Sequence, residues 1–268
     1  MQKGIKIRTT VMMLFMMAFA FAVSAQEKSA ASLYNEGLAF LKEKNYEAGL
    51  PLMEQALAKA ETDANEKVIN LAKKNGSVAA YNVGNTKRKA GDHDGAMAMY
   101  EKGITLNPEN PSNYSGKAAT LEAKGNKVDA VSAYLVAAEK QEAKGKADRA
   151  QKIVKKAQNT VGRMYTGKNY DDAVAAGKAF LALKPSAEVN YYVARSLTEK
   201  GMNEDAATYA DQAITLAGDT VDDKYYVAKA VILENLSKPA EAIEMYKMVT
   251  GEKYKKQAEY KIQTLGSK

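Results

Sequence analysis

Hydrophobic and polar residues alternate with the period of an amphipathic helix along most of the chain. In "GDHDGAMAMYEKGITLNP", Ala96, Tyr100 and Gly103 fall four and three residues apart after a polar turn. Near the end, "YKKQAEYKIQTL" repeats this spacing. Alternation typical of strands is scarce, whereas Ala, Lys, Glu, Leu and Met, which favour helices, are abundant. The pattern predicts an all-α protein.

The helical pattern itself recurs along the chain. A small residue follows a polar turn in six segments, and the separations between these residues are 47, 34, 43, 33 and 36. The residues are Gly49, Ala96, Ala130, Ala173, Ala206 and Ala242. Twelve positions earlier stand mostly small residues, namely Gly37, Gly84, Ala118, Val161, Ala194 and Ala230. Four positions after the second-helix alanine, three units have a tyrosine: Tyr100, Tyr134 and Tyr246.

A period near 34 residues, built from two helices and a turn, is typical of tetratricopeptide repeats, and the chain resembles that family over nearly all of its length after residue 30. The resemblance implies an all-α, right-handed α-solenoid superhelix of about six helix-turn-helix repeats with a C-terminal capping helix. It divides residues 26–268 into repeats at about 30–63, 77–110, 111–144, 154–187, 187–220 and 223–256, followed by a capping helix at about 253–265.

Packing between the helices of a repeat requires small residues, so we expect Gly84 to lie opposite Gly103. Asp94 and Asp129 stand near the start of second helices and are candidate caps. Residues 64–76 and 145–153 exceed the repeat length and have the pattern of lengthened helices. Two roles remain open for them: docking of a partner, or packing and a change of superhelical curvature.

The first 25 residues differ from the rest. Three cations precede thirteen apolar residues, Val11–Val23, and "VSA" then resembles a signal-peptidase site. We expect residues 1–25 to be a cleaved signal peptide and the mature protein to be periplasmic or secreted. A retained anchor is the alternative, but thirteen helical residues rise only about 20 Å, against about 30 Å of hydrocarbon. The mature chain has no other stretch of membrane-spanning length.

Charge and composition narrow the classes of function. The formal charge of +7 falls to +4 without the first three cations, and Lys and Glu are interspersed, which argues against nucleic-acid binding. Without cysteine the chain has no disulfide, thiolate chemistry or Cys-ligated zinc. The one histidine, His93, stands in a turn and lacks companion ligands. We expect no metal, no cofactor and no enzymatic activity.

What remains is binding of another protein, as expected from the family resemblance. In such repeats the first helices line the concave surface. Asn35, Asn82 and Asn159 share one first-helix place, and an Asn amide can pair with both groups of a peptide backbone. The candidate partner-binding residues on this surface are Tyr34, Asn35, Tyr81, Asn82, Asn85, Arg88, Lys155, Asn159, Tyr165, Tyr191, Tyr192 and Arg195.

The sequence therefore predicts a non-catalytic scaffold or adaptor of the bacterial cell envelope that grips a peptide or protein partner. Three alternatives stay open. The same groove could bind a glycan or a cell-wall peptide, the array could be a self-associating structural protein, or the candidate residues could be ordinary solvated helix surface. Fold alone does not choose among them.

Overall fold

The computed structural model describes residues 27–219 and 221–267, so the predicted signal peptide and the cleavage before Gln26 lie outside the described residues. Within these ranges the chain forms helices and no strand. The helices are α2 (Ala30–Lys42), α3 (Tyr46–Thr62), α4 (Glu66–Lys89), α5 (His93–Leu106), α6 (Pro111–Ala123), α7 (Lys127–Ala143), α8 (Ala147–Thr166), α9 (Tyr170–Leu181), α10 (Ala187–Glu199), α11 (Asn203–Ala217), α12 (Asp223–Asn235), α13 (Pro239–Lys247) and α14 (Glu252–Gly266). No helix in the described ranges is both long and apolar enough to cross a bilayer.

The chain divides into two compact units at Lys73 and Lys74. Unit one contains α2, α3 and the first part of α4. Its core joins the two helices of the first hairpin to α4, through Leu33, Met53, Ala56 and Val68 among others. The α2–α3 hairpin thus buries its apolar side against residues that the sequence places just after it, as expected for a repeat that needs a neighbour.

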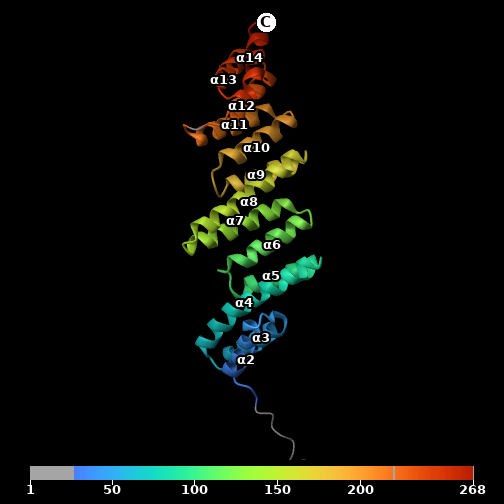
Figure 1. The fold of residues 1–268 in the computed structure, drawn as a ribbon, viewed down its shortest axis with the longest axis vertical. Coiled ribbons are helices and arrows are strands. Elements are labelled where there is room, and N and C mark those ends of the chain that lie inside the picture. The colour runs from blue at the N-terminus through green and yellow to red at the C-terminus, as the bar shows by residue number, and fades with distance from the viewer. Residues whose placement is uncertain (1–26, 220, 268) are drawn as a thin grey trace, which may run out of the picture. The chain divides into compact units, whose positions relative to one another are not determined.

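Unit two contains the rest of α4 and every helix up to α14. Figure 1 shows α5 to α14 following one another along this unit. The hairpins α4–α5, α6–α7, α8–α9, α10–α11 and α12–α13 alternate first and second helices, and α14 follows them. Between α6 and α12, one apolar core includes Tyr134, Val161, Phe180 and Leu197, all almost fully buried. The predicted all-α fold class is confirmed: the described helices form one hairpin in unit one, and in unit two a solenoid of five hairpins with a final helix.

Polar residues begin most of these helices. Asn45, Asp92, Asn126 and Ser186 each accept a hydrogen bond from the backbone N–H three residues on, which satisfies a donor that the helix leaves free. The expectation that Asp94 and Asp129 are caps is therefore wrong. Both lie inside the first turn, where the helix dipole favours an acidic side chain.

The small residues do not pack as expected, because Gly84 does not lie opposite Gly103. Gly84 on α4 and Gly116 on α6 both face the ring of Tyr100, which α5 inserts and which is fully buried. Gly103 instead faces the side chain of Asn113 on α6. The glycines make room for a side chain from another helix rather than for each other.

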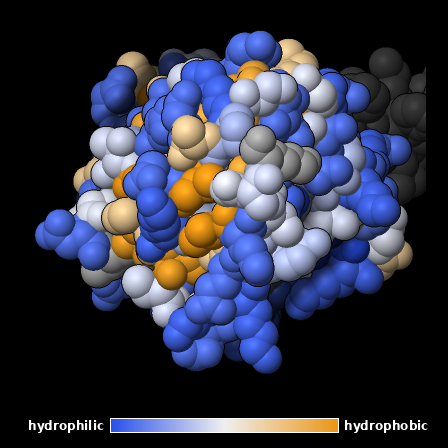
Figure 2. Space-filling view, turned by 90° about the horizontal axis from the view of Figure 1, so that it is seen from above, coloured by the Kyte–Doolittle hydropathy of each residue, from blue (hydrophilic) through white to orange (hydrophobic). Residues whose placement is uncertain are grey.

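Both segments that exceed the repeat length are largely helical. Residues 66–76 form the first part of α4, and residues 147–153 form the first part of α8. At the other end of unit two, α14 follows the last hairpin, and its exposed residues include several lysines and glutamates. Figure 2 views this end and shows an apolar patch near the centre of a largely hydrophilic surface.

Candidate partner-binding surface

Four tyrosines from three successive first helices lie in ring contact in unit two. Tyr165 lies in the last turn of α8, Tyr191 and Tyr192 lie on α10, and Tyr225 lies on α12. We call these four residues the tyrosine cluster. Ring centroids are 5.9 Å apart for Tyr165 and Tyr192, 6.5 Å for Tyr165 and Tyr191, and 5.6 Å for Tyr191 and Tyr225. These separations are those of stabilising aromatic pairs.

The neighbours of the cluster fix the rings in place. Tyr192 lies against Gly162 of α8, where an added Cβ would come within 2.8 Å of the ring. The hydroxyl of Tyr225 donates to Oε2 of Glu188 at 3.0 Å, and Lys224 donates to the same oxygen at 2.7 Å. Burial alone would raise the pKa of Glu188, but these partners outweigh it and hold the pKa below its ordinary value. The carboxylate therefore stays ionised and anchors α12 to α10.

Two cations accompany the rings. Lys224 Nζ lies 5.3 Å from the Tyr191 centroid and 5.1 Å from the Tyr225 centroid, and the Arg195 guanidinium lies 5.8 Å from that of Tyr165. All three distances are within the range of cation–π attraction. Arg195 also pairs at 3.6 Å with Glu199, while its buried Nε has no hydrogen-bond partner among the described residues. This nitrogen is therefore buried beside the rings without a partner among the described residues.

The cluster contains Tyr165, Tyr191 and Tyr192 from the sequence-based candidates, and Arg195, a fourth candidate, lies beside it. Three candidates on α4, namely Tyr81, Asn82 and Asn85, contact other groups of this chain instead. Asn85 accepts a hydrogen bond from the buried Tyr100 hydroxyl at 2.8 Å, and the Asn82 amide donates at 2.8 Å to Val78 O of its own helix. Tyr81 lies 6.1 Å from the Tyr100 ring.

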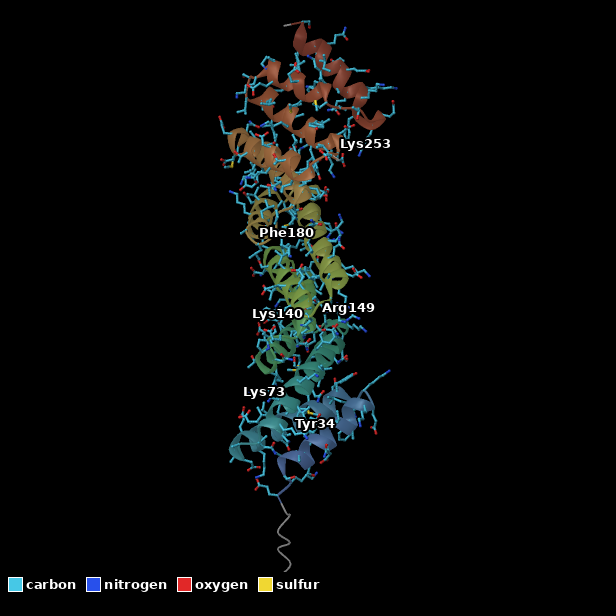
Figure 3. All side chains as sticks on the ribbon, turned by 90° about the vertical axis from the view of Figure 1, so that its left-hand side faces the viewer. Tyr34, Lys73, Lys140, Arg149, Phe180 and Lys253 are labelled. Carbon is cyan, nitrogen blue, oxygen red and sulfur yellow. The ribbon has the colours of Figure 1, made fainter. Side chains whose placement is uncertain are left out.

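The remaining candidates are scattered. Arg88 is half-buried near the end of α4, and its Nε has no partner among the described residues. Lys155 and Asn159 are exposed on α8. Tyr34 and Asn35 belong to unit one, where Tyr34 is buried in the core and Asn35 is exposed; Figure 3 labels Tyr34.

Sequence reasoning missed three residues of this site: Tyr225, which is buried, and Lys224 and Glu188, which are half-buried. Tyr225 stands 34 residues after Tyr191, so the repeat period offered a signal for it. No comparable signal marks Glu188 and Lys224, because their pairing depends on how α10 and α12 are rotated against each other.

Glu122 forms a second polar centre, which joins α6, α7 and α8. Its carboxylate accepts hydrogen bonds from the Tyr134 hydroxyl at 3.0 Å and from the Thr160 hydroxyl at 3.0 Å, and it pairs with Arg163. Glu234 repeats the arrangement, with the Tyr246 hydroxyl at 2.6 Å and Lys261 at 2.7 Å. Because all of these groups are matched within the chain, we assign both centres to stability rather than to binding.

Among the described residues, no group of three or more His, Asp or Glu side chains is placed to hold a metal ion. His93 is half-buried as the first residue of α5. The absence of a cofactor and of catalytic activity stays a prediction from the sequence.

Comparison with known proteins gives one match to a family model. Residues 78–110, the second half of α4 with α5 and the turn after it, match the model of the tetratricopeptide repeat. The matched hairpin is the one whose Tyr100 sits between Gly84 and Gly116. A search of curated proteins found no match.

Similar solved structures are distant. The crystal structure of MamA protein is 20% identical, with 69% of this chain and 94% of that chain covered and a TM-score of 0.40. The yeast Sti1 TPR2AB-domain:pHSP90-complex is 14% identical over 88% and 98%, with a TM-score of 0.37. PilW, a type IV pilus biogenesis factor, is 14% identical over 88% and 97%, with a TM-score of 0.35. Similarity at this level carries no argument about function.

Proposed function

We propose that this protein is a non-catalytic scaffold that binds another protein on the first-helix surface of unit two, meaning the exposed sides of α4, α6, α8, α10 and α12. The tetratricopeptide match at residues 78–110 supports the class of function. The tyrosine cluster supports the place, because aromatic rings from three helices meet there, with Tyr165, Tyr191 and Tyr192 half-buried and Tyr225 buried.

The chemistry of the cluster suits a protein partner. Its rings are packed against one another and tied to Glu188, so little side-chain entropy is lost when a partner covers them. Tyrosine offers apolar area together with a hydroxyl, and tyrosine and arginine are enriched among residues that dominate binding energy. Arg195, whose side chain is 26% exposed, adds a cation beside the Tyr165 ring, which can orient a polar group of the partner.

The proposed location is the bacterial cell envelope, either the periplasm or outside the cell. It rests on residues 1–25, whose charged start, apolar run and "VSA" suit a cleaved signal peptide. Intact-mass measurement of the protein recovered from its host tests this. The mass of a chain that begins at Gln26 supports export, and the mass of the full-length chain contradicts it.

The binding proposal is tested by affinity capture from an envelope extract, with the complete protein tagged at its C-terminus. The test variant replaces Tyr191 and Arg195 with alanine. The matched control is Tyr260→Ala, because Tyr260 is the most exposed large hydrophobic side chain described, at 65%, and lies on α14 outside the cluster. Circular dichroism first confirms that both variants keep their helix content.

We expect a protein that is enriched by the native bait and by Tyr260→Ala but lost with the cluster variant. Equal capture by all three baits would contradict the assignment of the site. Two alternatives have their own discriminators: co-sedimentation with purified cell wall would favour glycan or wall-peptide binding, and a mass that rises with concentration in light scattering would favour self-association.

A further inference from the structure

A row of unpaired cations lies on the exposed side of α8. Arg149, Lys152, Lys155 and Lys156 are all exposed, and we call them the α8 cationic face. Steps of three and four residues keep them on neighbouring positions of one helix side. The opposite side of the helix carries Ala150 and Ala157, which are fully buried. Figure 3 labels Arg149.

None of the four has an ion-pair partner among the described residues, whereas other cations around them do. Arg163, on the same helix, pairs with Glu122; Lys140 pairs with Glu109 at 2.7 Å, and Lys184 with Glu142 at 2.9 Å. Within α8 the single acidic residue is Asp148, in the first turn. Lys156 Nζ lies 4.6 Å from the Tyr134 ring centroid, which holds that side chain without neutralising it.

This segment also carries most of the positive charge of unit two. Residues 74–268 contain 30 Lys and Arg against 24 Asp and Glu, an excess of six. Residues 140–156 alone contain seven Lys and Arg against two acids, an excess of five. The remainder of the unit is nearly balanced, so the field of the unit is concentrated at the junction of α7 and α8 and along the first turns of α8.

Folding alone does not account for this arrangement. Like charges three and four residues apart on a helix repel one another and destabilise it. The first part of α8, residues 147–153, is moreover an addition to the repeat length, since residues 145–153 exceed the 34-residue period. The added turns bring two of the four cations and no compensating acid beyond Asp148.

We propose that the α8 cationic face binds an acidic segment of a partner protein. The inference rests on the proposed function, because the occupant is a protein that contacts a first helix. Four cations over eight residues of helix span about 10 Å, which fits a few acidic side chains. A nucleic acid fits less well, because the face has no aromatic residue of its own on which bases could stack.

The test uses fluorescence anisotropy with the complete protein and a labelled peptide of about ten alternating Glu and Ala residues at about 0.05 M salt. The test variant carries Lys152→Glu and Lys156→Glu. The matched control carries Lys168→Glu and Lys256→Glu, two exposed lysines outside the face that have no ion pair among the described residues, so the change in net charge is the same. We expect about tenfold weaker peptide binding by the test variant and little change in the control.

Binding by the native protein should also weaken about tenfold between about 0.05 M and about 0.3 M salt, because both partners are exposed to screening. The melting temperature of the test variant should rise or stay the same, since repulsion along α8 is relieved. If it falls instead, Lys152→Gln with Lys156→Gln repeats the binding measurement without introducing new charge, and the same loss is expected.

Three outcomes would overturn the inference: no peptide binding by the native protein, equal losses in the test and control variants, or tighter face-dependent binding of a single-stranded oligonucleotide or of anionic vesicles than of the peptide. The proposed function is judged separately by partner capture with the Tyr191 and Arg195 variant. If the Tyr191 and Arg195 variant loses partner capture but the native protein does not bind the acidic peptide, the proposed scaffold function is supported and the inference of an acidic partner segment is rejected.

Discussion

Glu122 offers the sharpest test of how unit two is held together. One carboxylate, 19% exposed, accepts hydrogen bonds from Tyr134 of α7 and Thr160 of α8 while it pairs with Arg163 of α8. Its replacement by glutamine keeps the shape and one acceptor oxygen but removes the charge. We therefore expect Glu122→Gln to weaken all three contacts at once.

The size of the effect follows from the kind of bond that is lost. Hydrogen bonds to a charged group contribute about 1.5–3 kcal/mol and those between neutral groups about 0.5–1.5 kcal/mol, so each contact should weaken by about 1 kcal/mol. Arg163 is 51% exposed and can be rehydrated, which keeps the total below the cost of breaking a fully buried pair. We expect Glu122→Gln to lower the free energy of unfolding by about 2–3 kcal/mol.

Urea denaturation at neutral pH measures this change, and hydrogen exchange locates it in α6, α7 and α8. The control is Glu109→Gln. Glu109 pairs with Lys140 at 2.7 Å but is 57% exposed, so that variant should lose less than about 1 kcal/mol. Equal losses in the two variants, or a loss below about 0.5 kcal/mol for Glu122→Gln, would refute the reasoning from buried charge.

The pH dependence adds a second check. Burial acts to raise the pKa of Glu122, but Thr160, Tyr134 and Arg163 outweigh it and hold the pKa below its ordinary value. A group whose pKa is lowered in the folded state contributes stability above its unfolded pKa and loses that contribution as the pH falls through the folded pKa. The gap between native protein and Glu122→Gln should therefore narrow below about pH 4. A gap that stays constant there contradicts the assignment.

Three further substitutions test other contacts by urea denaturation or hydrogen exchange. Gly116→Ala drives a Cβ into the buried Tyr100 ring and should cost about 1–3 kcal/mol despite its better helix propensity, whereas Gly266→Ala, which meets open space, should not destabilise. Ser77→Ala removes a fully buried hydroxyl bonded to Gly103 O, Asn110 and Asn113 and should cost about 1–3 kcal/mol. Asp223→Asn weakens the acceptor of two backbone N–H groups before α14, so faster exchange at the start of α14 is expected.

The fold could be predicted because its signals are local and periodic. The alanines chosen from the 34-residue period, such as Ala96, Ala130, Ala173 and Ala206, are all fully buried. A small residue recurs wherever two helices pack closely, so the same position holds a small residue in successive hairpins. The opposing partner of each small residue could not be predicted, as Gly84 shows, because it depends on the rotation of each helix about its axis.

The candidate surface could be predicted only in part for the same reason. Four of the twelve candidate residues lie in the tyrosine cluster or beside it, since repeats place equivalent residues side by side. Asn82 and Asn85 look like equally good binding residues in the sequence, yet one pairs with its own helix and the other with Tyr100. A polar side chain on a helix finds partners within the protein whenever they are near, and sequence spacing does not show which ones do.

Of the α8 cationic face only Lys155 was among the sequence-based candidates, because charges were compared along the chain rather than around the helix. Between Lys146 and Lys156, Ala, Gln, Ile and Val separate the cations, so no basic run stands out, although the helix places Arg149, Lys152 and Lys156 on one side.

The exposed first-helix surface thus combines rings whose packing is already complete with cations that lack partners. Exposed charges act mainly on the rate of association and packed rings on the rate of dissociation. If one partner covers both, charge reversal on α8 should slow its association, and Tyr191→Ala should speed its dissociation.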